Sequence, residues 1–491
     1  MYKYQSKQIT IMDFGMPCGM ELRADNEWVL KARLVPWDFI EDEYSGKFAG
    51  SKTGNVAKHS RLVFGSLAIQ RFYNCSDRVL VRMIRDTPCL QYFCGLPEFK
   101  QEAPFNASSL VNFRKRMTPE FMDKINEKMI SIGLNVMTQV VEHQEKQEAE
   151  GEKILKKITM NDEVVIDSSA CPQYITYPTD IKLIYAVVCK LLIMLIYLLE
   201  IDLDFKVAKK QVRDIYLNVV MKKKRTHEDI RSGVGKLLEY VDVYLKRVVY
   251  HLSIGKTLPN RFIDKLPIII KIYEQQIHKH RFPDVTIPNR ILSLSAWWSS
   301  SIYRNKDGAK FEYGSQFDLS TNNDFVRIER LSFAAYNEEI NLPTAIERYL
   351  KNYGHYPSAV LADTKYRNEN NRNLCSEHNI KLPGKPLGKN KAKEVNVSEA
   401  EEIEHKNKRT IVERKFSYVK GSFGLDCIHT FHPDTTKAVI YLGVFAMNLE
   451  TTLKYAMRLP EFLLLFIIRS IYTIISLLFA PYSRFKPSVA Q

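Results

Sequence analysis

The chain has 491 residues, of which 45% are hydrophobic and 26% are charged. These proportions exclude a disordered chain and leave room for two or three domains, each with its own core. The balance of 71 Lys and Arg against 56 Asp and Glu gives a net charge of +15. This charge favours a polyanionic partner, nucleic acid in the first place and an anionic membrane surface in the second.

The first 135 residues have the pattern of a helical domain. Between residues 55 and 132, apolar residues recur at intervals of three and four, and N-cap and proline signals mark helix ends. A basic cluster, Arg114, Lys115 and Arg116, precedes a further helix. We predict that residues 1–135 bind DNA or hold a dimer together, and periodicity alone does not separate these roles.

Residues 136–160 are rich in Gln, Glu and Lys, which indicates a polar linker or an exposed helix. From residue 161 to about 450 the pattern becomes that of a mixed α/β domain. A β-branched run ends in Asp167, and two more strand-like runs follow much later, at 310–321 and 324–333. After a helix, a short apolar run ends in Asp363, and the last predicted helix of this domain spans Lys408–Gly424.

A long insertion, at about residues 172–295, separates the first predicted strand from the next. Its centre is helical and basic, with Lys222, Lys223, Lys224 and Arg225 in a row. Such runs are usually solvated helix faces, but in a basic protein with an acidic candidate site we favour contact with DNA phosphates. The apolar segment near its start carries several charges, which favours a buried helix over a membrane span.

Residues 451–491 form an apolar tail. The run Phe462–Ala480 is interrupted only by Arg469 and is long enough to cross a bilayer. Because a charge at the middle of a span is costly, we favour a packing or oligomerising segment, and a membrane partner is the weaker interpretation. The eight cysteines have no regular framework and the N-terminus lacks a signal peptide, so we expect reduced thiols in a cytoplasm.

Three carboxylates are candidates for one site: Asp167, Asp363 and Glu413. On the last predicted helix, Arg409, Glu413 and Lys420 share a narrow stripe beside an apolar seam. Close carboxylates repel one another, and hard divalent cations such as Mg²⁺ or Mn²⁺ relieve that repulsion and support phosphoryl transfer in pairs. Taken alone, the helix is more simply a solvated helix with an ion pair between Arg409 and Glu413.

These motifs resemble those of the DDE transposases of bacterial insertion sequences. The resemblance covers roughly Tyr4–Glu450 and rests on SDRVLVRMIRDTPCLQYFCGLP, VNFRKRM, VVIDSSACPQYITYPTDIKLI, LADTKYRNENN and RTIVERKFSYVKGSFGLD. It implies an RNase H-like α/β core, a mixed sheet with a helical insertion after the first strand, preceded by an all-α domain. It also implies double-stranded DNA as the partner, both the terminal inverted repeats and the target. A homo-oligomer, in its simplest form a dimer, at the nucleoid of a bacterial cytoplasm would follow.

For the site, the resemblance implies that Asp167, Asp363 and Glu413 bind two catalytic Mg²⁺ or Mn²⁺ ions. Arg409 and Lys420 would contact the transposon end. Beside the second aspartate, the resemblance implies DNA contacts for a further pair, Tyr366 and Arg367.

Several alternatives remain open at this stage. Asp180 competes with Asp167 as the first acid, but it follows a proline and suits a helix N-cap better. Asp318 lies in a strand-like run and points either to the site or to solvent. Trp297 and Trp298 suit core packing better than base stacking. An RNase H-like nuclease without strand transfer, or a non-catalytic DNA-binding relic that acts as a repressor, would share these motifs.

Overall fold

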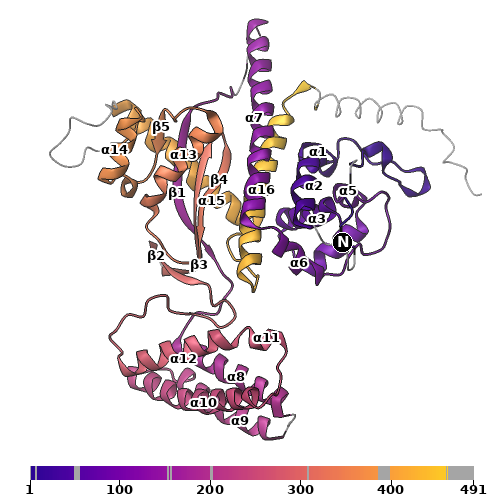
Figure 1. Ribbon diagram of the computed structural model, residues 1–491. Coiled ribbons are helices and arrows are strands. Elements are labelled where there is room, and N and C mark those ends of the chain that lie inside the picture. Colours follow the sequence, from indigo (N-terminus) through magenta and orange to yellow (C-terminus); the bar gives the residue numbers. More distant parts are fainter. Residues whose placement is uncertain are drawn as a thin grey trace, which may run out of the picture.

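The computed structural model describes residues 2–5, 8–48, 56–151, 154, 157–199, 203–306, 309–384, 399–460 and 462. Three parts are visible: an N-terminal group of helices, an α/β core, and a helical insertion below the core (Figure 1). Two long helices, α7 (Pro119–Ala149) and α16 (Pro433–Ala456), pack side by side between the first two parts. Of the apolar tail expected at 451–491, residues 451–456 complete α16, and residues 461 and 463–491 lie outside the described residues.

The regular elements of the N-terminal part are helices in its described residues, as the sequence predicted, with one isolated β-bridge between Gly15 and Glu98. Its α-helices are α1 (Glu27–Leu34), α2 (Trp37–Ser45), α3 (Ser60–Tyr73), α4 (Asp77–Asp86), α5 (Pro88–Phe93) and α6 (Ser109–Arg116), with short 3-10 turns η1 (Ile11–Asp13), η2 (Pro17–Gly19) and η3 (Gly46–Phe48). Aromatic side chains dominate its core, where Trp37 and Trp28 meet Phe93 edge to face at centroid distances of 5.2 and 4.9 Å. The buried Arg61 donates hydrogen bonds to the carbonyl oxygens of Tyr92 and Phe93, which fixes α5 on α3.

Helix α7 continues without a break through residues 136–149, the segment expected as a linker or an exposed helix. Thr118 caps its start and Pro119 occupies the first turn, where a missing N–H costs nothing. Met137 and Val140 are buried, whereas residues 142–148 are all polar and Gln144 is the buried one among them. The helix therefore carries the N-terminal part onto the core.

The core sheet is mixed. Its strands are β1 (Glu163–Pro172), β2 (Ser300–Lys306), β3 (Ala309–Asn322), β4 (Phe325–Ser332) and β5 (Ala359–Leu361). The long strand β3 pairs antiparallel with β1, β2 and β4, and β1 pairs parallel with β5. Asn323 and Asp324 join β3 to β4 with φ of 49° and 68°, the left-handed conformation of a two-residue hairpin turn that Asn and Asp tolerate.

Strand β1 extends further than the sequence suggested. We expected it to end at Asp167, but its ladder with β3 continues to the pair Pro172 and Gly314. A side chain at Gly314 would bring Cβ within 2.0 Å of the Cys171 carbonyl oxygen, so the close approach of the two strands requires glycine. Asp167 therefore lies in the middle of a strand, not at its end.

Helices cover both faces of the sheet. On one face, α15 (Glu399–Phe423) buries Val412, Phe416 and Val419 against the strands. On the other lie α13 (Leu342–Tyr353), α14 (Glu369–Glu377) and the short turns η4 (Glu338–Asn341) and η5 (Thr364–Tyr366). Since alternate strand residues point to opposite faces, each face of β1 packs against a different set of helices.

The insertion is a separate helical body with its own core. It contains α8 (Asp180–Leu199), α9 (Leu203–Val220), α10 (His227–Ser253), α11 (Asn260–Ile263) and α12 (Leu266–Arg281). Among the described residues, α8 is the one helix long and apolar enough to cross a membrane. Ten of its residues are buried within this body, in agreement with the buried helix that its interspersed charges predicted.

Candidate active site

The register of the sheet brings two of the predicted acids level with each other. Parallel pairing matches Glu163 of β1 with Ala359 of β5 and Val165 with Leu361. The same offset makes Asp167 level with Asp363, which lies two residues past β5 and keeps an extended backbone (φ −69°, ψ 160°). Neighbouring strands lie about 4.8 Å apart, and matched residues point to the same face. The two carboxylates therefore belong to adjacent segments and to one face.

That face is the one covered by α15. Val165 and Leu361, which alternate with the two acids, pack in one cluster with Val412 of α15. The Arg409 Nη1 atom lies 3.3 Å from Asp363 Oδ1, which makes an ion pair at the end of β5. The helix that carries Glu413 thus crosses the face from which both aspartates project.

A second set of contacts fixes the direction of α15. Lys408 Nζ lies 2.8 Å from a Glu163 carboxylate oxygen, and Lys420 Nζ donates to Ser169 Oγ over 2.8 Å. The twelve residues from Lys408 to Lys420 span about 18 Å of helix, and the six residues from Glu163 to Ser169 span about 20 Å of strand. Because these lengths match, α15 runs alongside β1. Glu413 is exposed and lies between these two anchoring contacts.

The aspartates also hold their local backbone. Asp167 Oδ1 accepts a hydrogen bond from Ser168 N at 2.8 Å, and Asp363 Oδ1 accepts one from Thr364 N at 2.7 Å and so caps η5. The Asp363 side chain keeps 44% of its surface exposed. It is therefore accessible from solvent while one of its oxygens is already oriented.

The donor set fits a hard divalent cation, because all three candidates offer carboxylate oxygens. The three acids do not converge on one point, however. In the described part of the chain, no group of three or more His, Cys, Asp or Glu side chains is close enough to hold a metal ion. The positive charge beside Asp363 comes instead from Arg409.

Two residues beside Asp363 that were expected to contact DNA are buried. Tyr366 is fully buried, its hydroxyl has no hydrogen-bond partner among the described residues, and burial above all, followed by Asp318, raises the pKa of this phenol. Arg367 is 3% exposed and donates to the Leu382 carbonyl oxygen at 2.8 Å. Both side chains are therefore buried in this conformation, and their contact with DNA stays a prediction.

The basic cluster on α6 has both buried and exposed members. Arg114 is buried and donates to Asp77 and to Gln70, the latter at 2.7 Å, so its charge belongs to the domain core. Arg116 donates to the Tyr44 hydroxyl at 2.8 Å and is half-buried. Lys115 is the exposed member of the three, because the face of α6 that carries Arg114 packs inward.

The basic run of the insertion lies in the turn between α9 and α10, not on a helix face. Lys222 Nζ pairs with Asp229 Oδ1 at 2.6 Å, and Arg225 Nε donates to the Lys222 carbonyl oxygen at 3.4 Å. Lys223 and Lys224 are exposed in the same turn. The run therefore remains available for phosphate contact, although the helical setting expected for it was wrong.

The competing acids have structural roles. Asp180 begins α8 and pairs with Lys279 at 2.7 Å and with Arg290, as a residue at a helix N-terminus with cationic neighbours would. Asp318 is buried on the face of β3 opposite to Leu319 and accepts a hydrogen bond from the Tyr336 hydroxyl at 2.6 Å. Burial raises the pKa of Asp318 to about 6.

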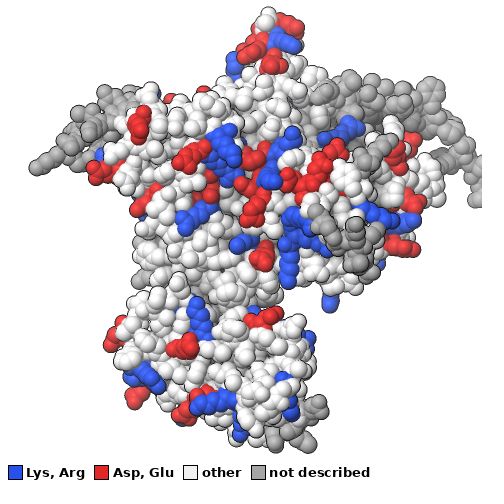
Figure 2. All heavy atoms as spheres, viewed as in Figure 1, with Lys and Arg blue, Asp and Glu red and all other residues white. Residues whose placement is uncertain are grey.

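Sequence reasoning missed the residues of β1 that hold α15, Glu163 and Ser169. Alternation from Asp167 predicts that both share its face, but their partners lie more than 240 residues later. The face of the molecule in Figure 2 shows Lys and Arg intermixed with Asp and Glu across its middle. The net positive charge is thus not gathered into one continuous band on this face.

Comparison with known proteins gives two family matches. A model described as "Transposase domain (DUF772)" matches residues 19–116, and one described as "Transposase DDE domain" matches residues 360–450. The second range contains Asp363 and Glu413 but not Asp167. A protein of Rhizobium meliloti described as "Uncharacterized protein ORF8 in nfe locus" is 26% identical over 152 residues, which are 31% of this chain and 64% of that protein. No solved structure matches the chain.

Proposed function

We propose that this chain, which its two transposase matches assign to the DDE transposases of insertion sequences, cleaves DNA at the ends of its element and joins the freed 3′-hydroxyl to target DNA. The observation that carries the proposal is the shared register of Asp167 and Asp363 beneath the helix that bears Glu413. A mixed sheet with these acids on one face is consistent with an RNase H-like core. Double-stranded DNA, both terminal inverted repeats and target, is the substrate that the basic charge favours.

In this proposal Asp167, Asp363 and Glu413 hold two Mg²⁺ or Mn²⁺ ions. Such ions, when bound, supply Lewis-acid stabilisation of the attacking and leaving oxygens of a phosphodiester. Arg409 and Lys420 flank Glu413 along α15 and already contact the Asp363 carboxylate and the Ser169 hydroxyl of the same face. From there their cationic groups would hold the phosphates on either side of the scissile bond.

The wider expectations belong to the same proposal. Cleavage at two ends of one element favours a homodimer, and DNA as substrate favours the nucleoid in a bacterial cytoplasm. Lys115 and the turn with Lys223 and Lys224 are exposed cations that would contact DNA away from the acids.

The test is an Asp363→Asn variant assayed on a duplex carrying the inverted repeats that flank the coding sequence. We expect loss of Mg²⁺- or Mn²⁺-dependent strand cleavage by at least about a hundredfold, with binding of the duplex retained. Asp86→Asn is the matched control, because Asp86 is also exposed and also pairs with an arginine, Arg85, far from the site. A fully active Asp363→Asn protein would contradict the assignment of the triad.

A second assay uses pre-cleaved ends and a target plasmid. Joining of the ends to the plasmid supports a transposase that transfers strands. Cleavage without joining supports an RNase H-like nuclease, and tight binding with neither reaction supports a repressor. The three outcomes are distinguished on the same protein preparation.

A further inference from the structure

Two cavities lie on either side of one exposed aromatic residue, Phe431. This residue belongs to the loop between α15 and α16, and 61% of its surface is exposed. A cavity of about 560 Å³ lies between Phe431, helix α8 and the segment 292–295 of the insertion. Another of about 860 Å³ lies between Phe431 and the N-terminal helices α3 and α6. All three parts of the molecule therefore meet at this loop, which we call the Phe431 junction (residues 427–432).

The loop is held firmly beneath the aromatic ring. Ile428 N donates to the Pro172 carbonyl oxygen, and Tyr174 N donates to that of Ile428, each at 2.8 Å, so the loop continues the end of β1. His429 stacks on Tyr174 with ring centroids 4.5 Å apart. Phe431 thus projects from a fixed backbone, as a stacking platform requires.

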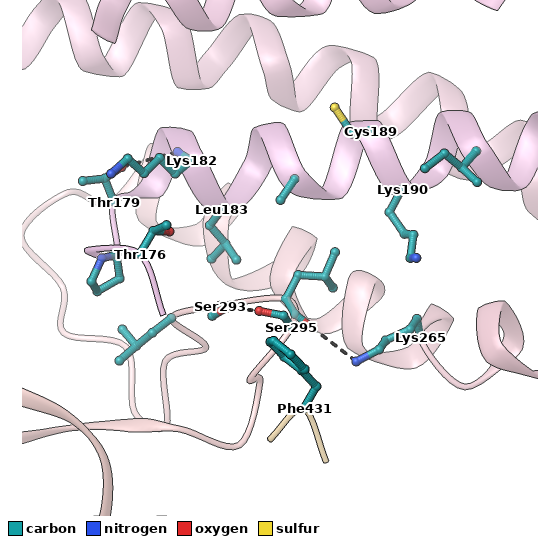
Figure 3. Close-up of a pocket in the computed structure, with 15 residues that line it drawn as sticks. Thr176, Thr179, Lys182, Leu183, Cys189, Lys190, Lys265, Ser293, Ser295 and Phe431 are labelled. Carbon is teal, nitrogen blue, oxygen red and sulfur yellow. Dashed lines mark hydrogen bonds between the residues drawn. The ribbon is translucent and has the colours of Figure 1, made fainter. Parts of the chain in front are cut away.

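The cavity on the insertion side is cationic. Lys182, Lys190 and Lys265 line it, and no acidic residue is among the described residues of its wall. Figure 3 shows Lys190 on α8 and Phe431 from the core loop approaching the same space as Lys265. Each lysine has a neutral partner. Lys182 Nζ donates to the Tyr177 carbonyl oxygen at 3.3 Å, Lys265 Nζ donates to that of Leu294 at 3.4 Å, and Lys190 Nζ lies 5.0 Å from the centroid of the Phe262 ring.

The cavity on the N-terminal side is of mixed sign. Arg71, Lys115, His429 and His432 line it together with Asp426 and the ion pair of Arg114 with Asp77. Burial lowers the pKa of His432, and the charges of Lys115 and Lys265 lower it further, while Asp434 opposes them. The His432 imidazole is therefore within electrostatic range of Lys115 from the N-terminal part and of Lys265 from the insertion.

We propose that the Phe431 junction binds an unpaired strand of DNA, with one base stacked on Phe431 and backbone phosphates on Lys182, Lys190 and Lys265. Cationic grooves interrupted by an exposed aromatic ring are the usual means of binding single strands without sequence preference. The apolar side chains of Leu183 and Leu294 beside the lysines suit a base with its phosphate better than phosphate alone. The inference rests on the proposed function, because unpaired DNA strands reach this junction only if the protein cleaves and joins DNA.

The test compares binding of two fluorescent oligonucleotide duplexes, one blunt and one with a single-stranded overhang, by the full chain. We expect the wild-type protein to prefer the overhang and Phe431→Ala to lose about tenfold in affinity for it, with blunt binding unchanged. Phe431→Trp should restore the preference. Phe282→Ala is the control, because Phe282 is 54% exposed on the neighbouring insertion but lies outside both cavities.

The lysines are tested by salt dependence. The double variant Lys182→Ala and Lys265→Ala should reduce the slope of log affinity against log salt by about 0.7 per lost contact with the overhang, whereas Lys271→Ala, on the exposed face of α12, should not. Equal binding of blunt and overhang DNA, or an unchanged preference in Phe431→Ala, would overturn the inference. Cleavage of the blunt duplex by the wild-type protein is measured in parallel. If cleavage persists, either of these results overturns the inference but leaves the proposed function standing. If the wild-type protein binds no DNA at all, both the inference and the proposed function are refuted.

Discussion

Replacing Arg409 with glutamine separates a structural role of this cation from a DNA-binding one. The Arg409 Nη1 and Asp363 Oδ1 atoms of its ion pair lie 3.3 Å apart. The two side chains are 35% and 44% exposed, respectively. Exposed pairs of this kind contribute about 0–1 kcal/mol, so we expect Arg409→Gln to change the free energy of unfolding by less than about 0.5 kcal/mol. The fold does not depend on this arginine.

The effect on DNA binding should be larger and depend on salt. One phosphate contact with duplex DNA contributes about 0.9 to the slope of log affinity against log salt. Between 50 and 200 mM salt, one such contact changes affinity by about three- to fourfold. Arg409→Gln should therefore lower the slope by about 0.9 and weaken binding most at low salt.

Lys408→Gln is the matched control, since it removes one positive charge from the neighbouring position of α15. Lys408 lies 2.8 Å from oxygens of Glu163 and Glu404, and the Glu163 side chain is only 16% exposed. We expect this variant to lose up to about 1 kcal/mol of stability and to keep the wild-type slope. Fluorescence anisotropy over a salt series and urea unfolding measure the two quantities. Equal slopes for the wild type and Arg409→Gln would refute the reasoning.

Three further predictions concern the frame of the site. Asn448→Ala should cost about 2–4 kcal/mol in urea unfolding, because it removes two hydrogen bonds to the backbone of Val326 and leaves that buried amide unpaired. Gly314→Ala should lower thermal stability by several degrees, because its Cβ would meet the Cys171 carbonyl oxygen. Asp318, with its pKa raised to about 6, should make stability fall by about 1.4 kcal/mol per pH unit from about pH 4 to 6.

The sign of the pH effect follows from burial. Between these pH values the unfolded chain has released the Asp318 proton while the folded chain retains it, so a rise in pH favours unfolding, and above pH 6 the term is constant. Asp318→Asn should remove this part of the slope in unfolding curves at several pH values. An identical pH profile in the variant would contradict the assignment, as would an Asn448→Ala protein of wild-type stability or a Gly314→Ala protein with an unchanged melting temperature.

The sequence was sufficient for elements with strong local signals. Periodicity predicted the helical first domain, two strand-like runs predicted β3 and β4, and a short apolar run predicted β5. The edge strand β2 was not foreseen, because SSIYRNK is polar and pairs only with the first half of β3. The end of β1 was misplaced for a related reason: Ser168–Pro172 has weak strand propensity and is held as a strand by pairing with residues about 145 positions later.

Side-chain roles were harder to foresee than elements. Arg114, Tyr366 and Arg367 look like DNA contacts in a linear motif, but all three are buried, and Arg114 and Arg367 donate hydrogen bonds within the protein. Asp77, which pairs with Arg114, lies 37 residues earlier, and no local signal connects the two. Asp167 and Asp363 could be linked from the sequence because each follows a strand-like run, whereas their shared register is visible only in the pairing of β1 with β5.

Helix α16 has two sets of buried side chains that face different neighbours. Leu442, Phe445 and Leu449 pack within the N-terminal helices, while Val444 and Met447 pack beneath the sheet that carries the acids. A substitution on this helix must suit both partners at once, so we expect α16 to accept fewer changes than α15, which packs mainly along one seam. For the same reason, neither half could be exchanged between relatives as an independent module without its own copy of α16.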